Sequence, residues 1–149
     1  METHNNIANS ILLLDNQLCF ALYSASLTMT KAYQPLLTAL GLTYPQYLVM
    51  LVVWEQDDMT VSEIGNRLFL DSGTLTPLIK RLEMAGLIVR RRDVEDERRV
   101  RVQLTDSGRR LETDATTLPG CIATKIGFNA EELLSLNQVV RQLRKQLID

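Results

Sequence analysis

Two cysteines are the side chains of this sequence whose chemistry is easiest to define. Cys19 and Cys121 lie about a hundred residues apart, which excludes a CxxC metal or redox motif and a disulfide-rich scaffold. In a reducing compartment both begin as thiols. Asp15 is a candidate N-cap, which would place Cys19 about one turn into a helix, where the positive end of the helix dipole favours the thiolate. A thiolate is the nucleophile that a hydroperoxide requires, whereas a buried cysteine acts only as a small hydrophobic side chain, and both interpretations stay open at this point.

The sequence has too few histidines for several kinds of functional site. The only histidine, His4, lies in the polar N-terminal tail, so a zinc or iron site or a Ser/His/Asp triad has almost no residues to draw on. We therefore expect no metal, no cofactor and no catalytic site. The N-terminal residues 1–10 are polar, and the apolar run Ile11–Leu14 is too short for a signal sequence or a membrane span, which favours the cytoplasm.

Basic residues are concentrated in one segment, although the formal net charge of the chain is −2. Between Lys80 and Arg110 there are ten basic and six acidic residues, so this segment carries +4 and the rest of the chain −6. A basic surface on an acidic protein is typical of a protein that contacts nucleic acid with one face and keeps another face for self-association.

The pattern at the start of the basic segment predicts two short helices joined by a tight turn. Thr60-Val61-Ser62-Glu63 has the form of a capping box, and Asp71-Ser72 offers a cap for a second helix that ends at Gly86. The apolar face of the second helix contains Leu75, Leu78, Ile79 and Leu82. The opposite face contains Ser72, Thr74, Thr76, Lys80 and Arg81. In a helix-turn-helix these polar side chains would contact DNA phosphates or base edges, although any amphipathic helix also has a solvated side.

A β-hairpin is predicted directly after these helices. Leu87–Arg92 and Arg99–Leu104 alternate apolar and polar residues, and the charged link between them is prone to turn. Helix, helix and hairpin in this order form a winged helix-turn-helix, whose hairpin reaches along the DNA backbone or into the minor groove. At the tip of the hairpin, Asp96 is expected to hold the turn or to orient Arg98, which a narrow minor groove would attract.

Further helices are predicted on both sides of the winged segment. A long helix follows Asp15 up to Leu40, and a buried helix covers Tyr47–Trp54. After the hairpin, a helix capped at Thr105 runs to about Leu118, and Pro119-Gly120 is expected to break it. A last helix, capped at Asn129, carries an apolar stripe of Leu133, Leu136, Val140, Leu143 and Leu147.

The sequence resembles the MarR family of dimeric winged-helix regulators. The residues that carry the resemblance are the run 71–82, the run 86–88, the wing segment 93–99, and Val102, Leu104, Thr105 and Gly108. The resemblance implies a mostly α fold with a small β-hairpin wing in a single domain over 1–149. Within it, about 43–110 would be the DNA-binding part, and about 11–42 and 111–149 the dimerisation helices. The stripe of the last helix would then be dimer interface.

Within this family, Leu14–Tyr23 resembles the regulators that respond to organic hydroperoxides. The resemblance implies that Cys19 is the peroxide-reactive thiol and that Tyr33 and Tyr44 hydrogen-bond it across the dimer. It also implies an intersubunit disulfide with Cys121, which follows Pro119-Gly120 and is expected to be mobile; an inert Cys121 is the alternative.

The function implied is that of a repressor. It would bind a palindromic site on double-stranded DNA as a homodimer and leave that site when organic hydroperoxides oxidise Cys19. Two alternatives stay open. One is a repressor released by a small aromatic or lipophilic ligand, with Cys19 only lining the pocket, and the other is a thiol peroxidase that turns over hydroperoxide.

Overall fold

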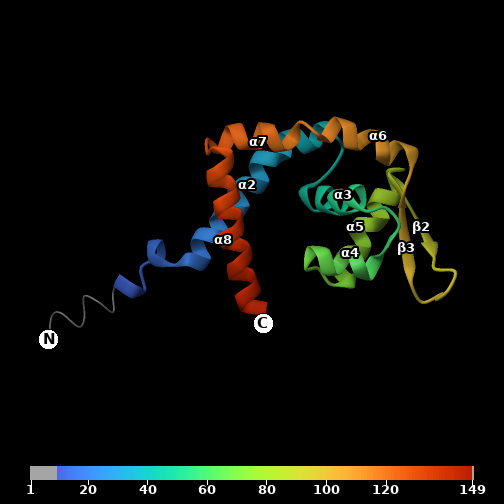
Figure 1. The fold of residues 1–149 in the computed structure, drawn as a ribbon, viewed down its shortest axis with the longest axis horizontal. Helices are drawn as coiled ribbons and strands as arrows, with labels where there is room; N and C mark the ends of the chain where they lie inside the picture. Colours follow the sequence, from blue (N-terminus) through green and yellow to red (C-terminus); the bar gives the residue numbers. More distant parts are fainter. Residues whose placement is uncertain (1–9, 149) are drawn as a thin grey trace. The chain divides into compact units, whose positions relative to one another are not determined.

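The computed structural model describes residues 10–148. The chain divides between Tyr44 and Pro45 into two compact units. Helices predominate, and the sheet found in the described part of the chain is antiparallel and three-stranded (Figure 1). The predicted helical fold with a β-hairpin wing is confirmed.

The first unit contains the 3-10 helix η1 (Leu14–Asn16) and helix α2 (Leu18–Ala39). Helix α3 (Tyr44–Glu55) begins at the boundary. The second unit continues with β1 (Met59–Thr60), α4 (Val61–Leu68), α5 (Ser72–Met84), β2 (Ile88–Arg92), β3 (Val100–Leu104), α6 (Asp106–Ala115), α7 (Leu118–Ile126) and α8 (Ala130–Ile148).

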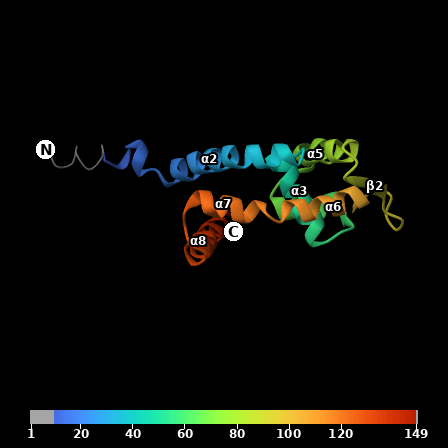
Figure 2. The ribbon, with the colours of Figure 1, turned by 90° about the horizontal axis from the view of Figure 1, so that it is seen from above.

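The start of α2 differs from the prediction, because Asp15 does not cap it. Asp15 lies inside η1, and α2 begins at Leu18 after Gln17, whose side chain makes no capping hydrogen bond. The Gln17 amide instead donates to the carbonyls of Ile11 and Leu13, at 2.7 and 2.8 Å, which folds the preceding segment back on itself. Helix α2 then continues without interruption to Ala39 (Figure 2).

The core of the second unit forms around α3. Tyr47, Val49, Met50, Val52 and Val53 are all buried, which confirms the predicted buried helix. They share the interior with apolar residues of α4, α5 and the sheet, namely Ile64, Leu75, Leu78, Ile79, Leu82, Ile88 and Val102. At this burial a Leu or Ile side chain contributes roughly 1.5–3 kcal/mol to folding.

The helix-turn-helix is capped as its sequence predicts. The Thr60 hydroxyl accepts from the Glu63 N–H, and the Glu63 carboxylate accepts from the Thr60 N–H, which completes the capping box of α4. The Asp71 carboxylate accepts from the Thr74 N–H at 2.8 Å and caps α5. Between the helices, Phe69 ends α4 in a left-handed conformation with φ 57°. A non-glycine residue is uncommon there, so the turn has a fixed and demanding geometry.

The wing is the predicted hairpin with a third strand added. Strands β2 and β3 pair antiparallel, with Ile88 opposite Leu104 and Arg92 opposite Val100. The short β1 pairs with the other edge of β3, with Met59 opposite Val102. This strand was not predicted, because two residues are too few for a period-two pattern. It joins the start of α4 directly to the wing.

The C-terminal helices correct a second prediction, because Pro119-Gly120 opens α7 instead of breaking a helix. Helix α6 ends at Ala115, and α7 begins at Leu118 with Pro119 in its first turn. The last helix is capped as predicted, since the Asn129 side chain accepts from the Glu132 N–H at 2.8 Å. Gly127 ends α7 with φ 78°, and there the chain turns sharply into α8 (Figure 1).

No single helix within residues 10–148 is both long and apolar enough to cross a membrane. Helices α2 and α3 meet that test only when they are taken together, by length and composition. The apolar side chains of α3 are those of the core described above.

Candidate functional site

Helix α5 separates its polar and apolar side chains as predicted. The four side chains of its predicted apolar face are buried, whereas Ser72, Thr74, Lys80 and Arg81 are exposed and Thr76 is half-buried. The buried stripe fixes the rotation of the helix, so the hydroxyls and cations are presented on its outer face. This is the arrangement that a recognition helix needs.

Asp96 organises the tip of the wing. One of its carboxylate oxygens accepts from both the backbone N–H and the Nε of Arg98, each at 3.1 Å, and the Asp96 carbonyl accepts from the Arg99 N–H. The hydrogen bonds from Arg98 hold the pKa of Asp96 below its usual value. The Arg98 side chain is 90% exposed, so the turn points an oriented guanidinium into solvent. Asp96 therefore holds the turn and also orients Arg98.

A cleft of about 240 Å³ lies between the helix-turn-helix and the wing. Ser72 and Thr76 of α5 and Arg98 of the wing, all predicted site residues, line this cleft together. Its other lining residues were not predicted from the sequence. The lining residues are Thr60, Val61, Ser62, Ser72, Thr76, Ile79, Arg90, Arg98, Arg99 and Val100. Hydroxyls and guanidinium groups on facing walls are suited to a phosphate.

Two arginines that the sequence reasoning also missed hold the wing at its base. Arg101 donates through Nε to the Asp58 carboxylate at 2.8 Å and through Nη1 to the Asp93 carboxylate at 3.0 Å. Arg90 donates to Glu83 of α5, which also accepts from the Arg90 N–H at 2.9 Å. These bonds lower the pKa values of Asp58 and Glu83. The period of two along β3 already places Arg101 on the face opposite to Val102, but its partners lie too far away in sequence to be predicted.

Cys19 is the second residue of α2 and is exposed. Tyr33 and Tyr44 pack against each other in the same unit, with ring centroids 5.1 Å apart. Burial raises the pKa of Tyr44 above its ordinary value. Because α2 rises 1.5 Å per residue, Tyr33 lies about 21 Å along the helix from Cys19. The two tyrosines are together, but they are out of reach of the cysteine in their own chain.

Cys121 lies in the first turn of α7. Its N–H donates to the Thr117 carbonyl at 3.1 Å, and its side chain is exposed. The predicted helix break at Pro119 was wrong because Pro119 lacks only an N–H that the first turn of a helix leaves unpaired in any case. Within residues 10–148, no three His, Cys, Asp or Glu side chains are grouped so as to hold a metal ion.

A capped helix pair, a polar recognition face and an oriented arginine on an adjacent hairpin define a winged helix-turn-helix DNA-binding protein. Comparison with known proteins agrees, since the family described as the SarA/Rot transcriptional regulators matches residues 31–114. The chain belongs to the MarR/SarA family of winged-helix transcriptional regulators. It is a DNA-binding transcriptional regulator and not an enzyme.

Two relatives illustrate the similarity. The chain is 48% identical over 134 residues to the organic hydroperoxide resistance transcriptional regulator of Bacillus subtilis strain 168, covering 90% of this chain and 91% of the relative. It is 34% identical to AbfR of Staphylococcus epidermidis in its reduced form bound to DNA, with a TM-score of 0.77 and coverage of 95% and 99%. Against the disulfide form of AbfR the identity is 35%, the TM-score is 0.63, and coverage is 96% and 95%.

Proposed function

We propose that this protein is a repressor that binds DNA as a homodimer and is released when organic hydroperoxides oxidise Cys19, through an intersubunit disulfide with Cys121. The observation that carries the proposal is the Tyr33–Tyr44 pair, which lies in one place while the cysteine of the same chain lies about 21 Å along α2. If this pair contacts Cys19, that Cys19 has to come from a second chain. Similarity to a regulator of organic hydroperoxide resistance supports the same assignment.

The exposed apolar side chains support a dimer. On α2 they are Leu18, Phe20, Tyr23, Leu27 and Met29. On α8 they are Leu134, Leu136, Val139, Val140, Leu147 and Ile148, and α8 has no buried residue at all. A helix this apolar and this exposed needs a partner surface. Of the stripe predicted on the last helix, Leu136, Val140 and Leu147 are exposed, whereas Leu133 and Leu143 are half-buried. The exposed members support assigning this stripe to an interface.

The proposed reaction has two steps. The Cys19 thiolate attacks the terminal oxygen of the hydroperoxide, the O–O bond breaks, and the alcohol leaves with a proton, which gives a Cys19 sulfenic acid. The Cys121 thiolate then attacks the sulfenic sulfur, the S–O bond breaks, and water leaves as the disulfide forms. Phenol O–H groups of Tyr33 and Tyr44 would donate to the thiolate before the first step.

DNA release would follow from the position of the Cys19–Cys121 disulfide. A disulfide from α2 of one chain to α7 of the other would change how the helices of the two chains pack. The separation of the two recognition helices would then change, and this separation has to match the spacing of the two half-sites. AbfR, a relative, was solved in its reduced form bound to DNA and also in a disulfide form, which supports a disulfide as one state of such a regulator.

A non-reducing gel after treatment with cumene hydroperoxide tests the disulfide. The reduced protein should become a covalent dimer, whereas Cys19→Ser and Cys121→Ser should stay single chains. A single-chain product from the unsubstituted protein with oxidised Cys19 would remove Cys121 from the mechanism. Peroxide consumption that continues with a thiol reductant while the protein stays bound to DNA would contradict the proposal and favour the thiol peroxidase, because in the repressor each oxidation of Cys19 has to release DNA.

A second candidate is release by a small aromatic or lipophilic ligand. It is favoured by a groove of about 260 Å³ in the second unit, lined by Tyr47, Leu51, Trp54 and Glu55 of α3 together with Glu112, Ala115, Thr116 and Pro119. The two candidates differ in their dependence on the thiol. Ligand release would persist in the Cys19→Ser variant, and peroxide release would not.

For the DNA contact we propose that Ser72, Thr74, Thr76, Lys80 and Arg81 form the reading surface, with Arg98 oriented by Asp96 at the wing. Arg98→Ala should weaken DNA binding and lower the slope of log affinity against log salt by about 1.8, since the homodimer loses two phosphate contacts at about 0.9 each. Asp96→Asn keeps the cation but loses its orientation, so it should weaken binding with a smaller change in slope. An unchanged slope in Arg98→Ala would remove Arg98 from the interface.

A further inference from the structure

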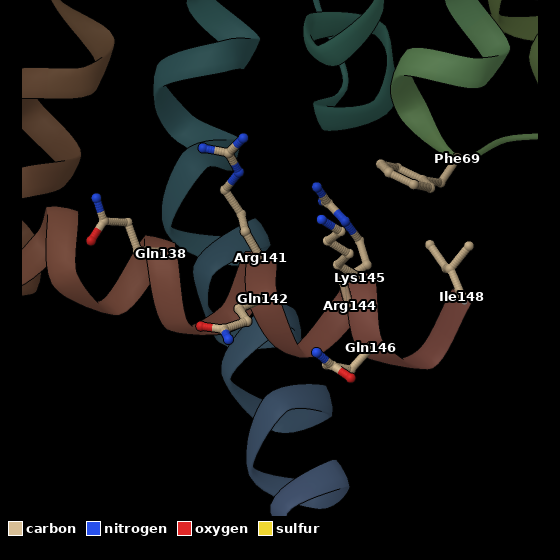
Figure 3. A pocket seen from close by; sticks show the side chains of 8 residues that line it. All are labelled: Phe69, Gln138, Arg141, Gln142, Arg144, Lys145, Gln146 and Ile148. Atoms are coloured by element: carbon tan, nitrogen blue, oxygen red, sulfur yellow. The ribbon is translucent and has the colours of Figure 1, made fainter.

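A second basic cleft lies in the same unit, on the far side of the helix-turn-helix from the wing. It has a volume of about 580 Å³ and is bounded by Phe69 at the end of α4 and by the C-terminal half of α8. Its lining residues are Phe69, Gln138, Arg141, Gln142, Arg144, Lys145, Gln146 and Ile148 (Figure 3). No acidic residue is among these lining residues.

Three cations define this cleft. Arg141, Arg144 and Lys145 follow the i, i+3, i+4 spacing of one helix face, and Figure 3 shows their side chains on the side of α8 where Phe69 lies. Within residues 10–148, no carboxylate lies within ion-pair distance of any of them. They are three of the six basic residues that the sequence contains outside the segment from Lys80 to Arg110. Positive charge is thus gathered here without a counter-charge.

Phe69 connects this cluster to the recognition helix. The Cζ atom of Arg144 lies 4.2 Å from the centroid of the Phe69 ring, a cation–π contact. Phe69 is held with φ 57° two residues before Asp71, the cap of α5. At 3.8 Å per residue, the Cα atoms of Phe69 and Ser72 are at most about 11 Å apart. In Figure 1, α4 and α5 lie between the wing and the C-terminal end of α8.

We propose that the α8 basic cluster, Arg141, Arg144 and Lys145, is a further contact to the DNA backbone, on the side of α5 that faces away from the wing. The contact neutralises phosphates and carries no sequence information of its own. The proposal rests on the DNA-binding activity of the family, and it is independent of the oxidation of Cys19.

The position of the cluster favours DNA over a small anion, because the cluster contacts Phe69 beside the helix-turn-helix. From Arg141 to Lys145 the helix rises about 6 Å, and one strand of B-DNA presents a phosphate about every 3.4 Å along its axis. The three cations therefore span two to three successive phosphates.

The test is the salt dependence of DNA binding by the reduced, full-length protein. The probes are a duplex that the protein selects from a random-sequence pool and a shuffled duplex of the same length and composition. The triple variant Arg141→Gln, Arg144→Gln, Lys145→Gln should lower the slope of log affinity against log salt by about 4–5 on both duplexes, because the homodimer carries each substitution twice and each lost phosphate contact is worth about 0.9. The double variant Arg141→Lys, Arg144→Lys keeps the positive charges, so its slope of log affinity against log salt should equal that of the unsubstituted protein.

The matched control is Lys125→Gln, an exposed cation of α7 outside the cleft, which should leave the slope unchanged. Because α8 is also the proposed dimer helix, the mass of each variant is measured in solution. If the triple variant changes that mass, Lys145→Gln alone carries the test, with an expected loss of about 1.8 for the two contacts of the homodimer. An unchanged slope, or a loss confined to the selected duplex, would overturn the proposal. Failure of the unsubstituted protein to bind either duplex would instead count against the DNA-binding assignment itself.

Discussion

At the scale of single residues, the proposed role of the Tyr33–Tyr44 pair is to activate the Cys19 thiol. The two rings are in contact, and burial raises the pKa of Tyr44 further above neutral pH. A donor stabilises the Cys19 thiolate, and a hydrogen bond to a charged group is worth about 1.5–3 kcal/mol. Reactivity of Cys19 is therefore expected to depend on residues of the other chain.

Replacing Tyr44 with Phe should slow the oxidation of Cys19 by cumene hydroperoxide by about tenfold or more, because the ring contact with Tyr33 stays while the O–H is lost. The rate is measured by trapping the sulfenic acid with dimedone and following the adduct by mass spectrometry. Tyr23→Phe, an exposed position on the same helix as Cys19, is the control. Equal rates in the two variants would argue against a role for the tyrosine pair.

At the scale of elements, Gly108 is the joint between the wing and α6. A Cβ at this position would meet the Leu87 carbonyl oxygen far inside van der Waals contact, and that oxygen is itself held by the Thr105 N–H. The Gly108 carbonyl accepts from the Trp54 indole at 2.9 Å, so the joint is also tied to the core helix α3. Only glycine allows the start of α6 to cross the wing this closely.

Gly108→Ala should lower the free energy of unfolding by roughly 2–4 kcal/mol, since backbone has to move to admit the methyl group. Gly120→Ala in α7 is the matched control, because a methyl group there would meet nothing within 4 Å outside its own helix. It should be neutral or stabilising by up to about 1 kcal/mol. Urea unfolding measures both. Similar losses of unfolding free energy in the two variants would mean that the close contact with the Leu87 carbonyl is not the cause of the loss in Gly108→Ala.

The ion pairs at the base of the wing predict how stability changes with pH. The Arg101 guanidinium lowers the pKa of Asp58, and hydrogen bonds from Glu95 and Arg101 lower that of Asp93. Carboxyls with lowered pKa values stabilise the fold above their ordinary values near 3.8, and this contribution is lost as the pH falls through the folded-state values.

Urea unfolding at neutral pH and in steps below about pH 4 should therefore show a steeper loss of stability for the unsubstituted protein than for Arg101→Met. In the variant Asp58 titrates closer to its ordinary value. Arg110→Met is the control, since Arg110 donates to the Ser107 hydroxyl. If the free energy of unfolding falls with pH in the same way in all three proteins, the ion pair between Arg101 of the wing and Asp58 does not contribute to stability.

Local patterns predicted those elements whose stability depends on neighbouring residues. The caps at Thr60, Asp71 and Asn129 and the polar face of α5 are of this kind. So is the Asp96–Arg98 turn, whose partners are two residues apart.

Contacts between distant residues could not be predicted in this way. The Arg101–Asp58 pair and the Trp54–Gly108 bond join residues that only the folded chain brings together. Two errors have local causes. Side chains at 16 and 17 bond carbonyls before α2 and displace Asp15 from the capping position, and a proline in a first turn begins a helix as readily as it ends one.

At the scale of the whole molecule, each unit leaves apolar helix faces without cover. Helix α2 in the first unit and α8 in the second expose large hydrophobic side chains, whereas the buried core belongs to α3 and the winged segment. One protein thus combines a rigid DNA-binding core with surfaces suited to self-association. A bond between Cys19 and Cys121 would act on those surfaces and not on the recognition helix itself.

The most direct test of this account follows DNA binding and thiol oxidation in one titration. Reduced protein is bound to a fluorescent duplex selected from a random pool, cumene hydroperoxide is added, and anisotropy is recorded while mass spectrometry reports the state of Cys19. The account predicts that DNA is released in proportion to the Cys19–Cys121 disulfide and is bound again after dithiothreitol, whereas Cys19→Ser stays bound throughout. DNA that remains bound after complete disulfide formation, or release from Cys19→Ser at the same peroxide concentration, would contradict it.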